Sequence, residues 1–306
     1  MADSFDPAEA ARYEELMRAW IPAGPRLTPS IPARVEKIYV LSRVTLGADI
    51  KITSIILDAM RHRFPAAELV FVAGRKSAEL FDVKVLHAEY PRKGTIQERI
   101  AFAHDLGLAA PNTIVVDPDS RMTQLGLIPL GDHYFHFPSR TATGAANLTD
   151  LTKNWLLATF GQTGEAFIAP VPVPMEGLGP RVALSLGVGE NESKRITGNF
   201  EAELLRDLSG QYRTVWLDRG AGGEEARRVT AAAAGLPNVR FWEGSFAGFA
   251  SIISQCDHYV GYDSAGQHAA AASAVPLTTY FAGACSARFR ERWAPAGRGQ
   301  ITVIAR

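Results

Sequence analysis

The sequence has little cysteine. Its two thiols, Cys256 and Cys285, are too few for a disulfide framework and do not stand in a metal-ligand spacing, so we expect a cytoplasmic protein. It also has no apolar run of the eighteen or so residues that a membrane helix requires, and residues 1–9 are polar and acidic, unlike a signal peptide. Contact with a membrane should therefore be peripheral at most, at the inner face.

An excess of charge of either sign is missing as well. The 32 basic and 32 acidic residues cancel, which argues against a general nucleic-acid binder and favours a small-molecule substrate. The Gly-x-Ser-x-Gly elbow of many hydrolases and the His-Glu-x-x-His helix of zinc proteases are absent too. These absences remove the commonest hydrolase classes.

Proline-rich stretches divide the chain of 306 residues into segments. Residues 1–33 combine a helical pattern at 7–20 with a stretch that holds four prolines, and residues 169–180 hold four prolines in twelve positions. The second stretch is typical of an extended, semi-rigid hinge linker. We therefore predict an N-terminal lead-in at 1–33, a first domain at 34–168, the linker at 169–180 and a second domain at 181–306.

Short apolar strands alternate with helical stretches in both domains. This alternation indicates parallel βαβ units and predicts an α/β protein with two Rossmann-like, doubly wound domains that face a cleft. The expected strands are 37–41, 68–73, 83–86, 113–117, 133–137, 181–186, 214–217, 239–242, 259–261, 277–281 and 301–304, and the expected helices are 49–63, 95–106, 148–160, 200–208, 223–234, 245–255 and 266–273.

In open α/β sheets ligands bind beyond the carboxyl ends of the strands, so the loops that follow strands are the candidate sites. After the first strand, Gly47 permits a tight turn and Asp49 stands where a helix begins. A carboxylate there is either a helix cap or a general base that takes a proton from an acceptor hydroxyl.

The loop that opens the second domain carries Lys194 and Arg195 behind two glycines, Gly187 and Gly189. Glycines let the backbone approach a ligand, and the two cations could neutralise a diphosphate, although a solvated surface turn would look the same. The loop matches neither the P-loop nor the dinucleotide fingerprint.

A strand also runs into a helix at Tyr259–Ala272, through Asp263, Ser264, Ala265 and Gly266. Free N–H groups at such a helix start, with the helix dipole behind them, suit a phosphate, whereas Asp263 or Ser264 could equally be an ordinary helix cap.

Four further residues extend the candidate set. Asp117 and Asp119 could hold a divalent cation, although Asp-Pro-Asp-Ser is also good turn chemistry, and we favour the turn. Arg140 could reach an anionic acceptor, and Glu243 follows a strand where a carboxylate could bind a ribose, with a solvated turn carboxylate as its alternative. His133 and His136 lie three apart on a strand, where side chains point to opposite faces, so they should not share a metal.

Taken together, these motifs resemble glycosyltransferase family 9, the heptosyltransferase-like enzymes of GT-B architecture. The resemblance is carried by the segments 46–72, 190–196 and 238–283, and it implies Asp49 as the catalytic base and Lys194 as a phosphate contact. Asp263, Ser264 and His268 match the family's donor-binding turn. Two positions depart from the family pattern: Ala48 is inserted before Asp49, and Ala265 stands where the family has glycine.

The resemblance implies inverting, metal-independent transfer of a heptose or another sugar from a nucleotide diphosphate sugar to a glycan or glycolipid of the cell envelope. We expect no cofactor and an ADP-sugar donor. Donor-binding residues would be Lys194, Arg195, Glu243, Asp263, Ser264, Ala265, Gly266 and His268, with Asp49 as the base and Arg140 at the acceptor. A non-catalytic nucleotide-sugar binding protein, an epimerase of the same fold and a metal-dependent transferase that uses Asp117 and Asp119 remain as alternatives.

Overall fold

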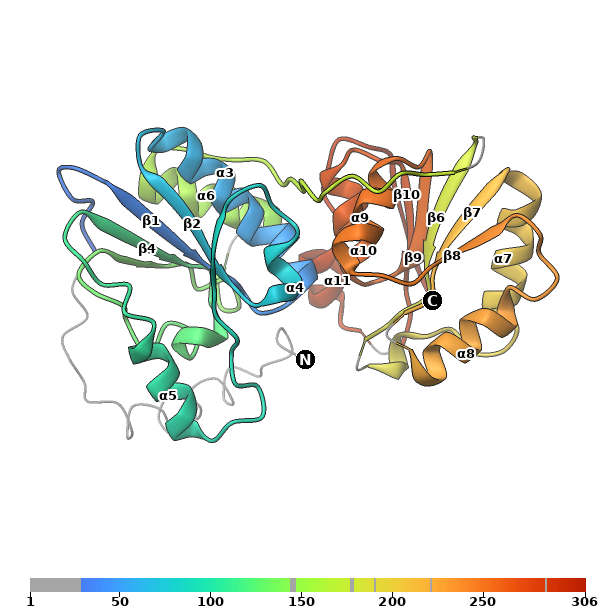
Figure 1. Cartoon of the computed structure of the whole chain (residues 1–306), viewed down its shortest axis with the longest axis horizontal. Helices are drawn as coiled ribbons and strands as arrows, with labels where there is room; N and C mark the ends of the chain where they lie inside the picture. The colour runs from blue at the N-terminus through green and yellow to red at the C-terminus, as the bar shows by residue number, and fades with distance from the viewer. Residues whose placement is uncertain (1–28, 144–146, 177–178, 190, 221, 284) are drawn as a thin grey trace. The chain divides into compact units, whose positions relative to one another are not determined.

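The computed structural model describes residues 29–143, 147–176, 179–189, 191–220, 222–283 and 285–306 (Figure 1). The helical pattern expected at 7–20 lies outside these residues. The described chain forms two compact units. Unit 1 contains the described residues up to Ala78 together with Asp82–Ala166, and unit 2 contains Glu79–Phe81 and the chain from Phe167 onward.

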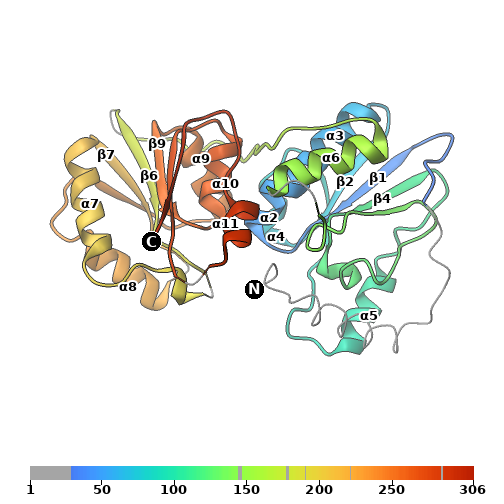
Figure 2. The same cartoon turned by 180° about the vertical axis from the view of Figure 1, so that it is seen from behind.

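Unit 1 is built on a parallel sheet of five strands in the order β3-β2-β1-β4-β5. Helices α3 and α6 pack together on one face and α5 covers the other (Figures 1 and 2). The elements are β1 (Lys37–Leu41), α2 (Leu46–Ala48), η1 (Asp49–Thr53), α3 (Ser54–Arg63), β2 (Glu68–Ala73), α4 (Arg75–Ala78), β3 (Lys84–His87), α5 (Ile96–Asp105), β4 (Thr113–Asp117), η2 (Arg121–Thr123), β5 (Tyr134–His136) and α6 (Leu148–Phe160).

Unit 2 is built on a parallel sheet of six strands in the order β11-β10-β9-β6-β7-β8. Helices α9 and α10 pack on one face, and α7 and α8 on the other (Figure 1). The elements are β6 (Arg181–Ser185), η3 (Glu192–Lys194), α7 (Phe200–Gln211), β7 (Thr214–Asp218), α8 (Gly223–Ala232), β8 (Val239–Trp242), α9 (Phe246–Ser254), β9 (His258–Tyr262), α10 (Ala265–Ala272), β10 (Leu277–Phe281), α11 (Ala287–Trp293) and β11 (Ile301–Ala305).

The two doubly wound sheets confirm the fold class predicted from the alternation of strands and helices. The strand starts are reproduced to within one residue. The central strands are buried apolar runs such as β4, whose five residues are all buried, whereas the edge strands β3 and β11 hold no buried residue. Two short helices, α4 and α11, were not predicted. Both are rich in charged residues and lack the apolar stripe on which the sequence prediction depends.

The helix that carries Asp49 contains a π turn. It runs from Leu46 to Arg63, and within it the backbone N–H of Ser54 donates to the carbonyl of Asp49, five residues earlier. A π turn holds one residue more than an α turn and is frequent at functional sites. The π turn begins directly after Ala48, the residue that departs from the expected family pattern.

Candidate functional site

The centre of the unit 2 sheet is a point where the strand order reverses. From β6 the chain proceeds to β7 and β8 on one side and then returns to β9 on the other side of β6. Ligands of doubly wound sheets bind beyond the carboxyl ends of the strands at such a point. The loops after β6 and β9, which carry Lys194 and Asp263, are therefore the ones to examine for a ligand site.

Lys194 and Asp263 bring these two loops together. The Lys194 Nζ donates to Oδ2 of Asp263 at 2.6 Å and to its backbone carbonyl at 3.3 Å, and it lies 5.1 Å from the ring centre of Phe289. The Asp263 side chain is buried, whereas that of Lys194 is about a quarter exposed. A partly exposed cation fixed at the end of the sheet can receive an anionic ligand.

The start of α10 has no side-chain cap. Ser264 occupies the N-cap position, and its hydroxyl makes no hydrogen bond to the first turn of the helix. The first N–H groups of a helix have no partner within the helix, so these donors remain to be satisfied by water or by a ligand. Ser264 and Ala265 are partly exposed, so a ligand can approach this end of the helix.

Gly266 allows close packing beneath this turn. A Cβ atom at Gly266 would lie 2.1 Å from the hydroxyl oxygen of Tyr259, and one at Gly261 would lie 2.4 Å from it. The phenol is fully buried beside the side chains of Ser185 and Ser264, and burial raises its pKa. The displaced glycine of the motif therefore has a structural reason, because the Tyr259 side chain occupies the space that a side chain at 266 would need.

The side chains that follow in α10 face the interior. Gln267 donates to Oδ1 of Asp263 at 2.6 Å, which leaves both carboxylate oxygens of Asp263 occupied. His268 is 5% exposed, and its ring lies 6.0 Å from that of Trp293. Their contacts support a role in holding Asp263 and the helix in place.

Two predicted donor-binding residues are engaged with neighbouring charges. Arg195 pairs with Glu192 and lies 3.7 Å from the buried Glu201, so its contacts support a role in holding the loop. Glu243 forms an exposed ion pair with Arg219 beyond the end of β8. Neither side chain contacts Lys194 or Asp263 among the hydrogen bonds and ion pairs of the described residues.

The sequence analysis missed a pair of carboxylates, Asp218 and Glu225, near the same edge. Asp218 ends β7, next to β6, and accepts a hydrogen bond from Ser185 at 3.3 Å. Burial raises the pKa of both carboxyl groups, and the Asp218 charge adds to the effect on Glu225. In doubly wound sheets, an acid at the end of the strand next to the first strand commonly binds a ribose. The position of Asp218 at the end of β7 could therefore have been recognised in the sequence.

In unit 1, Asp49 is completely buried, and four donors saturate its carboxylate. Oδ1 accepts from the backbone N–H of Arg43 at 2.7 Å and from Thr53 at 2.9 Å, and Oδ2 accepts from Ser42 and Ser77, both at 2.7 Å. Burial raises the pKa of this group, while the hydrogen bonds act in the opposite direction. This geometry suits a structural centre that ties the loop after β1 to η1 and α4.

The carboxyl end of β4 carries two more buried acids. Asp117 accepts from the N–H of Ser120 and from the hydroxyls of Thr123 and Tyr134, and burial raises its pKa. Asp119 instead pairs with His136 and Arg140. Among the described residues no group of three histidine, cysteine or acidic side chains is placed to hold a metal ion.

Four arginines gather beside these acids: Arg92, Arg99, Arg121 and Arg140. Burial lowers the pKa of Arg121, and the like charges of the other three add to the effect. Arg92 donates to the carbonyl of Val44 and Arg99 to the carbonyl of Arg92 at 2.7 Å, and these contacts do not neutralise their charge. This arginine cluster is a candidate site for an anionic group, and it includes Arg140, the predicted acceptor contact.

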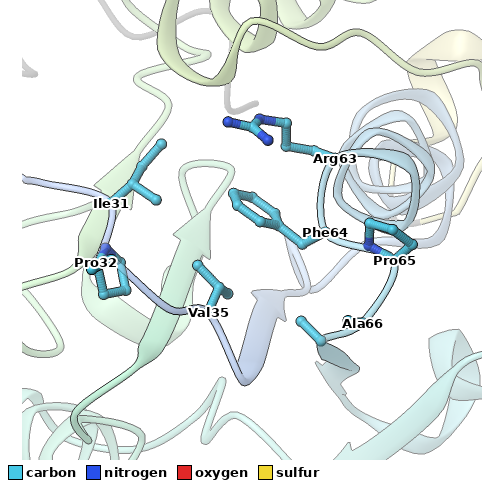
Figure 3. A pocket seen from close by; sticks show the side chains of 9 residues that line it. Ile31, Pro32, Val35, Arg63, Phe64, Pro65 and Ala66 are labelled. Carbon is cyan, nitrogen blue, oxygen red and sulfur yellow. The ribbon is translucent and has the colours of Figure 1, made fainter.

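A cavity of about 330 Å³ lies at the opposite, amino end of the unit 1 sheet. Figure 3 shows the Phe64 ring pointing toward Ile31 and Val35, with Arg63 above it. Its position before β1 and β2 separates it from the polar loops described above. In the part of the chain that the structure describes, every helix is too short or too polar to cross a membrane.

The fold is similar to those of several solved structures. No protein-family model and no curated protein sequence matches the chain. Among solved structures, a glycosyl transferase family 9 protein from Veillonella parvula has a TM-score of 0.66 at 14% identity, and the match covers 90% of this chain and 88% of that one. The E. coli heptosyltransferase WaaC has a TM-score of 0.64 at 15% identity, with 88% and 93% covered.

A third similar structure, the E. coli ADP-heptose LPS heptosyltransferase II, has a TM-score of 0.55 at 16% identity, with 87% and 89% of the two chains covered. These matches confirm, at the level of the fold, the resemblance predicted from the sequence. The chain thus has the two-sheet GT-B architecture of these glycosyltransferases.

Proposed function

We propose that the chain is a glycosyltransferase that moves a sugar from a nucleotide diphosphate sugar to an anionic glycan or glycolipid. The observation that carries this proposal is the Lys194–Asp263 pair, fixed beside the uncapped start of α10 where the strand order reverses. A cation and free backbone N–H groups at one point are suited to a diphosphate. The fold shared with WaaC, which was solved with ADP and with ADP-2-deoxy-2-fluoro heptose, supports an ADP-sugar as the first donor to test.

In this proposal unit 2 binds the donor and unit 1 binds the acceptor. Lys194 and the first N–H groups of α10 stabilise the charge that develops on the leaving diphosphate, and Asp218 and Glu225 accept hydrogen bonds from the ribose hydroxyls. The arginine cluster holds an anionic group of the acceptor. An acceptor hydroxyl then attacks the anomeric carbon from the face opposite the leaving group, which inverts the configuration without requiring a metal.

Calorimetric titration of the purified full chain with ADP tests the donor site. We expect Lys194→Ala to weaken ADP binding about 10- to 100-fold, since a charge-assisted hydrogen bond contributes about 1.5–3 kcal/mol. Lys153→Ala, which removes an exposed ion pair with Glu165 in unit 1, is the matched control and should leave the affinity unchanged. Absence of binding to ADP, UDP, GDP and dTDP would contradict the proposal.

A second candidate function, a non-catalytic nucleotide-sugar binding protein, is favoured by one observation. The expected base, Asp49, is buried with both oxygens occupied, so an acceptor hydroxyl has no direct path to it. Incubation with ADP-heptose and a phosphorylated glycan acceptor separates the two candidates. A transferase releases ADP and forms a glycosylated product, whereas a binding protein retains the intact donor.

A further inference from the structure

A buried phenol lies beneath the start of α10. Tyr259 is the second residue of β9 and is fully buried, and α10 packs against this strand (Figure 1). Its side chain runs past Gly261 and Gly266, because a Cβ atom at either glycine would overlap the Tyr259 hydroxyl oxygen. The hydroxyl group therefore lies beside the first turn of α10, at the carboxyl end of the strand.

The Tyr259 hydroxyl has no hydrogen-bond partner among the residues that the structure describes. The hydroxyls of Ser185 and Ser264 are near enough to act on the pKa of the phenol, but neither meets its oxygen within the distance and angle of a hydrogen bond. Nearly all buried polar groups in proteins are paired, since a buried hydroxyl without a partner costs free energy. The free chain thus holds a buried donor that a small shift on ligand binding can satisfy.

The phenol is also suited to remain a donor. Burial raises the pKa of Tyr259 above its ordinary value, so the hydroxyl keeps its hydrogen at neutral pH. A neutral phenol can donate this hydrogen to a serine oxygen that lies beside it.

Ser264 is the neighbour through which this donor can reach a ligand. It occupies the N-cap position of α10, is partly exposed, and makes no side-chain hydrogen bond to the first turn of the helix. The Ser185 hydroxyl, in contrast, already donates to Oδ2 of Asp218 at 3.3 Å. A serine that gives its hydrogen to an anion keeps lone pairs on its oxygen, with which it can accept from a phenol.

Resting on the function proposed above, we propose that Tyr259 strengthens the binding of the donor diphosphate through Ser264. When a phosphate oxygen meets the first N–H groups of α10, the Ser264 hydroxyl donates to it and the Tyr259 hydroxyl donates to the Ser264 oxygen. Hydrogen bonds in such a chain polarise one another, so the phenol makes Ser264 a stronger donor. Tyr259 touches no ligand atom and is a positioning residue.

This arrangement predicts opposite effects on stability and on affinity. In the free chain the Tyr259 hydroxyl is buried without a partner, so its removal should stabilise the fold. In the complex the same hydroxyl is hydrogen-bonded, so its removal should weaken binding. A tyrosine with a merely structural role would lose stability when its hydroxyl is removed, and its ligand affinity would not change.

The test is Tyr259→Phe in the full chain, because this variant keeps the ring and removes only the hydroxyl. In calorimetric titration we expect the affinity for ADP and for inorganic pyrophosphate to fall about 3- to 10-fold. Without ligand, the midpoint of thermal unfolding should rise by about 2–5 °C. Tyr212→Phe is the matched control for affinity, since the Tyr212 ring lies 6.5 Å from that of His258 at the opposite, amino end of β9. It should bind both probes as the unaltered chain does.

Tyr262→Phe is the control for the sign of the stability change. The Tyr262 hydroxyl, on the same strand, donates to Oε1 of Glu201 at 3.1 Å and accepts from the backbone N–H of Ile196 at 3.3 Å. Its removal should therefore lower the midpoint of thermal unfolding.

A double-mutant cycle tests the route through Ser264. Once Ser264→Ala has removed the serine hydroxyl, adding Tyr259→Phe should cost no further affinity for ADP or pyrophosphate. Additive losses of affinity in the two variants would overturn the route.

The outcomes separate this inference from the function on which it rests. Failure of the unaltered chain to bind ADP, UDP, GDP, dTDP or pyrophosphate overturns both. If the unaltered chain binds ADP or pyrophosphate, equal affinity of Tyr259→Phe overturns the role of Tyr259 alone. A lower unfolding midpoint of Tyr259→Phe does the same, because the hydroxyl would then have a partner in the free chain.

Discussion

The loops that follow β1 and β6, the central strands of the two sheets, use their polar groups in opposite ways. After β1, the Ser42 hydroxyl and the Arg43 N–H turn inward and supply two of the four hydrogen bonds that saturate the buried Asp49. After β6, Lys194 reaches the next loop at Asp263 and stays partly exposed, beside a helix start without a side-chain cap. The same position in a doubly wound sheet can thus hold the backbone together or receive a ligand, and the partners of the polar groups decide which.

The largest effect on stability should come from removing Asp49, the acceptor at the centre of the loop after β1. Asp49→Ala leaves four buried donors without an acceptor, and we expect a loss of about 3 kcal/mol in the free energy of unfolding of unit 1, or roughly 6–12 °C in its midpoint. Hydrogen exchange in β1 and α3 localises the loss. Asp105→Ala, at an exposed aspartate, is the control, and an equal effect there would contradict the structural role of Asp49.

Gly266→Ala tests the packing of the Tyr259 side chain beneath the start of α10. The added methyl group would meet the Tyr259 phenol at 2.1 Å, and such overpacking costs about 1–3 kcal/mol. Gly210, near the end of α7, has nothing within 4 Å of its Cβ position, so Gly210→Ala should stabilise by about 1 kcal/mol through helix propensity. Thermal unfolding of both variants measures the difference, and destabilisation of similar size in both would contradict the role of the Tyr259 contact.

Two acids of unit 1 should change stability in opposite directions with pH. The pKa of Asp49 is raised by burial in the folded protein. Its contribution to the free energy of unfolding is therefore present below the ordinary aspartate pKa of about 3.9, and it is lost as the pH rises through the pKa of the folded state. The pKa of Asp119 is lowered, so its contribution is present above the ordinary aspartate pKa and is lost as the pH falls.

Relative to the unaltered chain, Asp49→Asn should therefore gain stability as the pH rises above about 4. Asp119→Asn should lose stability as the pH rises toward about 4 and change little above it. Urea unfolding between pH 3 and pH 7 measures both slopes, and slopes of the same sign would contradict the assignment.

The smallest effect is expected at Ser264. Because its hydroxyl does not cap α10, Ser264→Ala should change the free energy of unfolding by less than about 0.5 kcal/mol, whereas an active N-cap would cost about 1 kcal/mol. Ser245→Ala is the comparison, since Ser245 does cap α9 through Gly248. Equal losses of unfolding free energy in the two variants would contradict the absence of a side-chain cap at the start of α10.

The sequence analysis predicted the fold well because alternating apolar strands and helices are local patterns. It also proposed the loops after β6 and β9 as candidate sites, since glycines, charges and their place after a strand are visible in the sequence. It did not foresee the surroundings of Asp49, because Ser77 is distant along the chain and meets the carboxylate only through the fold. The pairing of His136 with Asp119 was also missed, because the histidines were considered only as ligands of a shared metal.

The π turn at Asp49–Thr53 also bears on how related sequences should be aligned with this one. Each residue of an α-helix advances by about 100°, so one inserted residue would rotate all that follow away from the sheet. A wider turn can take up one extra residue locally, and Ile55, Ile56 and Ala59 are all buried after the turn. An alignment gap therefore belongs at this turn, where chain length can change by one residue without altering which side chains α3 presents to the core.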